Sequence, residues 1–381
     1  MFKFLFCLIT IVFASLIFSN KVNAVFDPLE NENNFFGIHV LFPSELDQAS
    51  SLVNSTDGAW GYVTIPIQSS DKDLVKWQAF MDEAREKKLI PIIRLATESL
   101  YKNTSVWRKP DESDIIDFAN FLNSLDWPVE NRYVVIYNEV NRFDEWGGEA
   151  PNPQRYGELL SFSYDVFKRR SEDFYIIMAG LDNASPNDRV LYMDNLVYIK
   201  EMIDSNPDIV NKMDGFSSHS YPNPAFSQPP SATKIIGTAT YKYEYELINK
   251  NSDKKIPAFI TETGWISDNL TDDLVASYYK TAYEQIWGQD KDKIVAITPF
   301  LLNSNGGQFE NFSFIINGEK SKHYESTRNI GKTTGTPLLS DVKGIQIKPI
   351  VAKVERFFTK TTIDTSKYAQ NLVTEYIKIF F

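Results

Sequence analysis

The sequence is short of two residue types that build many functional sites: its 381 residues include one cysteine and three histidines. The cysteine, Cys7, lies in the apolar N-terminal stretch, so the remaining chain has no thiol for a disulfide bond or a thiolate-bound metal. The histidines form no His-x-His pair of the kind that metal-dependent hydrolases use. No G-x-G-x-x-G motif follows an early strand-like segment to bind a dinucleotide. We therefore expect neither a metal site nor an organic cofactor.

Positive charge is also scarce. The chain has 39 Lys and Arg residues against 50 Asp and Glu residues, which gives a formal net charge of −11 at pH 7. Removal of an N-terminal leader with its two lysines, Lys3 and Lys21, changes the charge from −11 to −13. Nucleic acid and anionic lipid are poor partners for so acidic a chain. We expect a neutral ligand and a monomeric protein.

Long apolar runs are confined to the N-terminus. Lys3 precedes an apolar run over residues 4–18, and the sequence Val22-Asn23-Ala24 offers small residues at the spacing of a cleavage site. We therefore predict a signal peptide over residues 1–24, cleaved after Ala24, and a secreted or extracytoplasmic mature chain that is not bound to a membrane. An uncleaved anchor is the alternative, although the run is shorter than the ~20 residues that span a bilayer.

Strand-like apolar runs alternate with segments of helical periodicity along the chain. The runs cover residues 36–42, 60–67, 89–96, 133–137, 175–179, 215–219, 258–261 and 294–301. Helix candidates between them include residues 74–88, 112–125, 153–171, 192–205, 231–250 and 272–289. Near-continuous apolar strands are typical of a parallel sheet covered on both faces. Eight such units predict an α/β protein with a (β/α)8 TIM-barrel fold, and an open doubly wound sheet is the alternative.

Two of the predicted strands end in a carboxylate. The segment YVVIYNEVN, residues 133–141, places Asn138 and Glu139 after the fourth strand, and PAFITETGW, residues 257–265, places Glu262 at the end of the seventh. Active sites of such barrels lie at the C-terminal ends of the strands, so these side chains would face one another across the barrel mouth. Either carboxylate alone fits a solvated loop residue or an ion-pair partner, whereas two at matching positions indicate a paired site.

The motifs NEV after strand four, SSHSYP on strand six and TETGW on strand seven resemble those of the retaining β-glycosidases of clan A. The resemblance covers residues 35–315. NEV with ETGW is most similar to glycoside hydrolase family 17, whereas the His-x-Tyr pattern looks more like families 5 and 39. The resemblance implies that Glu139 is the general acid/base, that Glu262 is the nucleophile, and that Asn138 binds the sugar 2-hydroxyl. These roles require a raised pKa at Glu139 and an ionised Glu262.

The same resemblance assigns Tyr221 and Arg94 as hydrogen-bond donors to Glu262. Arg94 departs from the clan pattern, in which the arginine usually ends strand two, and an ion pair that only stabilises the fold is its alternative. His219 and His39 lie near the ends of strands six and one, where either is a candidate to bind a sugar hydroxyl or orient a glutamate. A position in the core is the alternative for His39.

Aromatic residues supply candidate surfaces for stacking on a sugar ring. Trp265 follows the nucleophile motif and Trp146 lies in the loop after strand four, although buried packing fits either residue. Strand eight, VAITPFLLN, lacks the tryptophan that many clan members place beneath the sugar. Phe300 or Trp265 is the expected substitute.

We therefore predict a glycoside hydrolase that cleaves β-glycosidic bonds of oligo- or polysaccharides through a covalent glycosyl-enzyme intermediate. A carbohydrate-binding barrel without turnover and a transglycosylase that uses the same residues are the alternatives. The catalytic barrel is expected over residues 25–330. Residues 331–381 are expected to form a C-terminal extension of no assigned function, with a weak amphipathic helix over residues 367–380.

Overall fold

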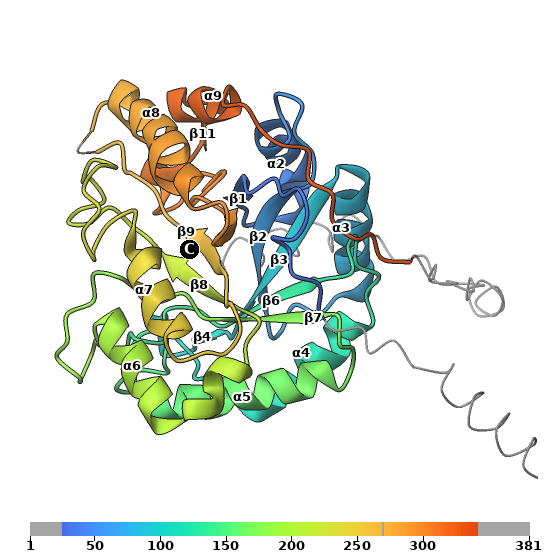
Figure 1. The fold of residues 1–381 in the computed structure, drawn as a ribbon, viewed down its shortest axis with the longest axis vertical. Helices are drawn as coiled ribbons and strands as arrows, with labels where there is room; N and C mark the ends of the chain where they lie inside the picture. The colour runs from blue at the N-terminus through green and yellow to red at the C-terminus, as the bar shows by residue number, and fades with distance from the viewer. Residues whose placement is uncertain (1–24, 269, 342–381) are drawn as a thin grey trace, which may run out of the picture. The chain divides into compact units, whose positions relative to one another are not determined.

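A barrel of eight parallel strands forms the centre of the computed structural model, which describes residues 25–341 apart from residue 269. A parallel bridge between Phe36 and Ile297 joins the first and last strands and closes the barrel. Figure 1 shows the strands at the centre with the helices around them. The predicted (β/α)8 barrel is confirmed. In order around the barrel the strands are β1 (Gly37–His39), β2 (Gly61–Gln68), β3 (Leu89–Ala96), β6 (Arg132–Ile136), β7 (Phe174–Met178), β8 (Gly215–His219), β9 (Ala258–Glu262) and β10 (Ile294–Ile297).

Helices follow the strands and form the outer layer, and their buried apolar side chains belong to one hydrophobic cluster with those of the strands. A π-helical segment, Ala282–Ile286, continues the helix that leads into β10. The helices are α2 (Leu46–Val53), α3 (Leu74–Glu86), α4 (Glu112–Asn123), α5 (Pro153–Lys168), α6 (Asn195–Ser205), α7 (Thr240–Asn249), α8 (Asp272–Thr281) and α9 (Lys322–Arg328).

Two helices begin later than their periodicity predicts. The helix expected from residue 192 begins at Asn195, because Asp194 accepts hydrogen bonds from the backbone N–H groups of Leu196 and Val197 and caps the first turn. The helix expected from residue 231 begins at Thr240, and turns and bends precede it. The helix α9 is only seven residues long, too short to give a clear periodic signal.

Aromatic side chains fill the interior of the barrel beneath the C-terminal strand ends. The rings of Tyr133 and Tyr175 lie 5.0 Å apart, and that of Phe259 lies 5.6 Å from Tyr133. Tyr62 completes this cluster from β2, with its ring 6.1 Å from Tyr133. The interior of the barrel is therefore a packed core, and the candidate polar side chains lie at its C-terminal end.

Two short hairpins are added to the barrel. The first, β4 (Ser99–Leu100) with β5 (Asn103–Trp107), follows β3, and the second, β11 (Ile315–Ile316) with β12 (Glu319–Lys320), follows β10. Because they extend connections that leave the C-terminal ends of strands, both lie on the side of the barrel that carries the candidate residues.

The described part of the predicted C-terminal extension contacts the opposite, N-terminal side of the barrel. The Gly335 N–H donates to the Ala59 carbonyl, and the Glu130 N–H donates to the Leu338 carbonyl. The predicted signal peptide and the predicted helix over residues 367–380 lie outside the described residues. Within the part of the chain that is described, no helix has the length and apolar character needed to cross a membrane.

Candidate active site

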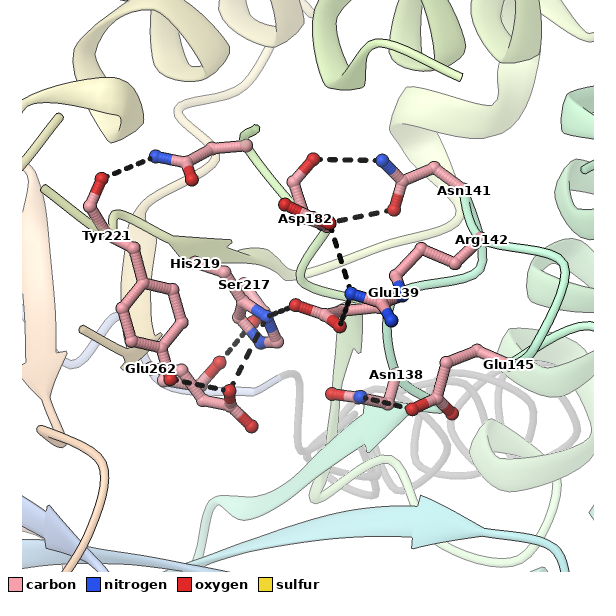
Figure 2. A network of polar contacts seen from close by, with 12 residues as sticks. Asn138, Glu139, Asn141, Arg142, Glu145, Asp182, Ser217, His219, Tyr221 and Glu262 are labelled. Atoms are coloured by element: carbon pink, nitrogen blue, oxygen red, sulfur yellow. Dashed lines mark hydrogen bonds and ion pairs between the residues drawn. The ribbon is translucent and has the colours of Figure 1, made fainter. Parts of the chain in front are cut away.

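The ends of three strands bring the candidate residues together, as Figure 2 shows. β8 ends at His219 and β9 ends at Glu262, whereas Glu139 lies three residues beyond the end of β6. The backbone between β6 and this glutamate turns sharply, with φ of +69° at Tyr137 and +37° at Glu139. Such left-handed conformations cost about 1–3 kcal/mol in residues other than glycine. The Glu139 N–H donates to the Gly180 carbonyl at 2.9 Å, which holds the turn in place.

The two candidate carboxylates are neighbours. One side-chain atom each of Glu139, His219 and Glu262 forms a group in which all atoms lie within 4.8 Å of one another. The side chain of Glu262 is 9% exposed and that of Glu139 is 15% exposed. Two carboxylates this close and this little exposed do not take up charge equally. Their surroundings decide which of the two is ionised.

Glu262 is surrounded by hydrogen-bond donors and positive charge. Arg94 Nη1 lies 2.7 Å from its Oε1 atom, and the Tyr221 hydroxyl donates to its Oε2 atom at 3.0 Å. Burial alone would raise the pKa of Glu262, but the charges of His219 and Arg94, with the hydrogen bond from Tyr221, together lower that pKa below its usual value. Glu262 is therefore ionised near neutral pH.

Arg94 connects Glu262 to the residue that precedes the other glutamate. Its Nη1 atom also donates to Asn138 Oδ1 at 2.6 Å. In the strand register, Arg94 of β3 lies beside Pro66 of β2. Arg94 thus reaches the site from the third strand, at the register level that Pro66 occupies on the second strand.

Glu139 lies in a different environment. A hydrogen bond of 2.9 Å joins its Oε1 atom to His219 Nδ1, and Arg142 Nη1 lies 3.6 Å from its Oε2 atom. Burial raises the pKa of Glu139 above its usual value, although His219 and Arg142 oppose that rise. Burial would lower the pKa of His219, but the charges of Glu262 and Glu139 outweigh it and raise that pKa. Glu139 is the carboxylate of the pair that takes up a proton more readily.

Two charged residues that the sequence analysis missed also belong to this site. Arg142 lies 2.8 Å from Asp144 and 3.2 Å from Asp182, besides its approach to Glu139. Glu145 Oε1 accepts a hydrogen bond from Asn138 Nδ2 at 3.2 Å. Figure 2 shows Arg142, Asp182 and Glu145 with Glu139. The sequence feature that could have indicated both residues is the run of charged residues in the loop directly after NEV.

His39 adjoins the site from β1. It is completely buried, and neither ring nitrogen has a hydrogen-bond partner among the described residues. Its Nε2 atom lies 3.9 Å from Glu262 Oε1, and its ring packs against Phe300. Burial, with the charge of Arg94 nearby, lowers the pKa of His39 to about 3. His39 is therefore neutral at physiological pH and forms no ion pair with Glu262.

The expectation that Trp265 binds substrate needs correction. Trp265 is fully buried, packs its ring against Tyr279 at 4.9 Å, and donates from Nε1 to the Gln228 carbonyl at 2.7 Å. Trp146 is likewise buried. Both side chains point into the packing between loops and helices, so neither offers a face to a sugar. Phe300 is the one of the expected aromatic residues that stays beside the site, 5.1 Å from the ring of His39.

The group of Glu139, His219 and Glu262 has ligand types and spacing that could also hold a metal ion, and no other such group occurs among the described residues. Each of its members already hydrogen-bonds to a protein side chain, and Arg94 holds positive charge 2.7 Å from Glu262. A fixed cation at this position works against a second cation. The arrangement fits a pair of carboxylates with different protonation states better than a metal site.

No protein-family model matches this sequence, and no curated protein matches it either. Solved structures do resemble the fold. A family 39 glycoside hydrolase from the gut symbiont Bacteroides cellulosilyticus superposes with a TM-score of 0.56 at 16% identity, over 81% of this chain and 64% of that one. A glucosidase from Croceicoccus marinus gives a TM-score of 0.57 at 11% identity, over 79% of this chain and 68% of that one.

A family 5, subfamily 18, protein from Streptomyces cattleya, solved in complex with Manb1-4GlcNAc, gives a TM-score of 0.53 at 12% identity, over 78% of this chain and 80% of that one. The fold thus resembles that of these glycoside hydrolases. The fold that the sequence motifs imply is thus confirmed by structural neighbours in families 39 and 5. This chain spans somewhat less than two thirds of the family 39 protein, and identities this low establish the fold alone.

Proposed function

We propose that the protein is a retaining β-glycosidase that hydrolyses β-linked oligo- or polysaccharides, with Glu139 as acid/base and Glu262 as nucleophile. The observation that carries this proposal is the separation of the two carboxylates: one oxygen of Glu139 lies within 4.8 Å of one oxygen of Glu262. Retaining enzymes keep this pair about 5 Å apart, whereas inverting enzymes need about 6.5–9.5 Å to admit a water molecule. The opposite pKa shifts of the two glutamates support the same division of roles.

In the first step Glu139 gives its proton to the glycosidic oxygen while Glu262 attacks the anomeric carbon. The C–O bond to the leaving group breaks, and an ester between the sugar and Glu262 forms. Arg94 and Tyr221 keep Glu262 ionised and aimed until it attacks. Asn138 binds the 2-hydroxyl, a contact that strengthens as the ring approaches the oxocarbenium ion.

In the second step Glu139, now ionised, removes a proton from water, and the water oxygen displaces Glu262 from the anomeric carbon. Two inversions at one carbon give net retention. His219 is hydrogen-bonded to Glu139 and is the cation nearest to it, so it stabilises the ionised form that this step requires. Replacement of water by a sugar hydroxyl would give transglycosylation with the same residues.

The structural neighbours support carbohydrate as the substrate class, because each of those described is named as a glycoside hydrolase or glucosidase. Secretion after cleavage of residues 1–24, a monomeric state and the absence of a membrane-bound form belong to the same proposal.

Release of reducing sugar from β-glucans and of phenol from aryl β-glycosides tests this function. The wild type should turn over at least one of them, and Glu139→Ala or Glu262→Ala should each abolish activity toward natural substrates. Glu149→Ala is a matched control, because Glu149 lies in the loop after β6 but pairs at the surface with Lys109. Carbohydrate binding without turnover by the wild type would favour the non-catalytic barrel instead.

A further inference from the structure

The amide of Asn138 is fixed from two sides. Its Oδ1 atom accepts from Arg94 at 2.6 Å, and its Nδ2 atom donates to Glu145 at 3.2 Å. A flipped amide would set its NH2 group against the guanidinium and its oxygen against the carboxylate, which would lose both hydrogen bonds. Arg94 is shared with Glu262, so Glu145 is the partner that acts on Asn138 without also holding the nucleophile.

Stability of the fold gives no reason for a carboxylate at this position. Glu145 is only partly exposed, yet no Lys, Arg or His nitrogen of the described residues lies within ion-pair distance of it. Burial and the neighbouring charge of Glu139, opposed by Arg94 and by the Asn138 hydrogen bond, raise the pKa of Glu145 to about 7. Asp144 adds a further negative charge nearby. A buried acid without an ion-pair partner is a net cost to folding, so its use must lie elsewhere.

We propose that Glu145 is a positioning residue of the site: its Oε1 atom holds the Asn138 amide so that the second N–H faces the sugar 2-hydroxyl. This inference rests on the proposed glycosidase function. The bond from Asn138 Nδ2 uses one of the two amide hydrogens and leaves the other for substrate. Glu145 thus acts on the reaction through Asn138 and touches no reacting atom.

Because Glu145 is proposed to act only through the contact of Asn138 with the sugar 2-hydroxyl, substrates with and without that hydroxyl test the inference. Glu145→Ala should lower kcat about 10-fold on an aryl β-glycoside, because a hydrogen bond aligned in the transition state is lost, while KM changes little. On the corresponding 2-deoxy glycoside the same variant should lose less than about 2-fold, since Asn138 has no hydroxyl to bind. Glu145→Gln should keep most of the activity, because its amide oxygen can still accept from Asn138.

Two further readouts separate positioning from a structural role. Asn138→Ala combined with Glu145→Ala should be no worse than Asn138→Ala alone, because both changes remove the same contact. The melting temperature of Glu145→Gln should equal or exceed that of the wild type, since a buried carboxylate is replaced by a neutral group. Glu149→Gln, a surface variant of the same loop, should match the wild type in every assay.

A pH profile adds a readout of charge. Glu145→Gln removes a negative charge beside Glu139 and so lowers the pKa of Glu139, which moves the alkaline limb of kcat/KM to lower pH.

If Glu145→Ala lowers kcat by the same factor on the 2-hydroxy and 2-deoxy substrates, the inference is overturned, whereas the proposed function is not affected. Additive losses in the double variant, or a lowered melting temperature of Glu145→Gln, would do the same. Absence of any turnover by the wild type would overturn both.

Discussion

His219 Nδ1 lies 2.9 Å from Glu139 Oε1 and 3.8 Å from the nearer oxygen of Glu262, so one imidazole sits between the two candidate catalytic carboxylates. The ring is buried, and the two carboxylates raise its pKa. Its positive charge lowers the pKa of both glutamates. His219 therefore sets the pH range in which one glutamate is protonated and the other is ionised.

Replacement of His219 by asparagine should move both limbs of the kcat/KM profile to higher pH. The acid limb reports protonation of Glu262 and the alkaline limb reports deprotonation of Glu139, and loss of a nearby cation raises both pKa values. Activity at the optimum should fall about 10-fold or more, because a hydrogen bond to a charged group is lost. Limbs that stay in place, or that move to lower pH, would contradict this role for His219.

Substitution of Gly180 by alanine should disturb the same histidine through packing. A Cβ atom at this position would overlap the imidazole ring of His219 and the Ser217 hydroxyl. We expect a loss of about 1–3 kcal/mol in the free energy of unfolding from overpacking, together with reduced kcat. Gly331→Ala is the matched control, because nothing lies near its Cβ position. Full activity in Gly180→Ala would contradict this prediction, because it would show that the His219 imidazole can move without loss of function.

The strands of this barrel could be predicted because both faces of each are buried, which produces continuous apolar runs. The positions of Glu139 and Glu262 followed from the rule that catalytic residues lie at C-terminal strand ends. Packing contacts could not be predicted in this way. Trp265 lies three residues beyond Glu262, and only the three-dimensional structure shows that its side chain turns toward Tyr279 and away from the site.

Long-range register and loop conformation account for the other differences. The pairing of Arg94 with Glu262 depends on the register between β3 and its neighbours, which a single sequence does not display. Glu145 contacts Asn138 within the loop after β6, whose backbone is left-handed at Tyr137. Tyrosine gives no local indication of such a conformation, so the sequence could not place Glu145 in the site.

Trp265→Phe tests the corrected role of this tryptophan. The variant should lower the free energy of unfolding by about 1–3 kcal/mol, because the Gln228 carbonyl loses its buried donor. KM should stay within about 2-fold of the wild type, since the ring does not reach the substrate. Urea denaturation and steady-state kinetics measure the two effects. A raised KM with unchanged stability would restore Trp265 to the binding site.

Metal dependence is tested by removal and by addition. Prolonged treatment with a chelator should leave activity unchanged, because two carboxylates carry the proposed mechanism without an ion. Excess Zn²⁺ should inhibit, since Glu139, His219 and Glu262 can ligate it together and would then be unable to react. Loss of activity on chelation, with recovery on return of a metal ion, would show that the group is a metal centre.

Rescue by azide distinguishes the two glutamates and tests the role assigned to each. With a substrate whose leaving group departs without protonation, Glu139→Ala should still form the glycosyl-enzyme on Glu262 and then stall. Azide should restore turnover and give the β-glycosyl azide after two inversions, whereas Glu262→Ala with azide should give the α-azide after one. We predict opposite anomers from the two variants, measured by NMR of the products. The same anomer from both, or full activity in either without azide, would contradict the account.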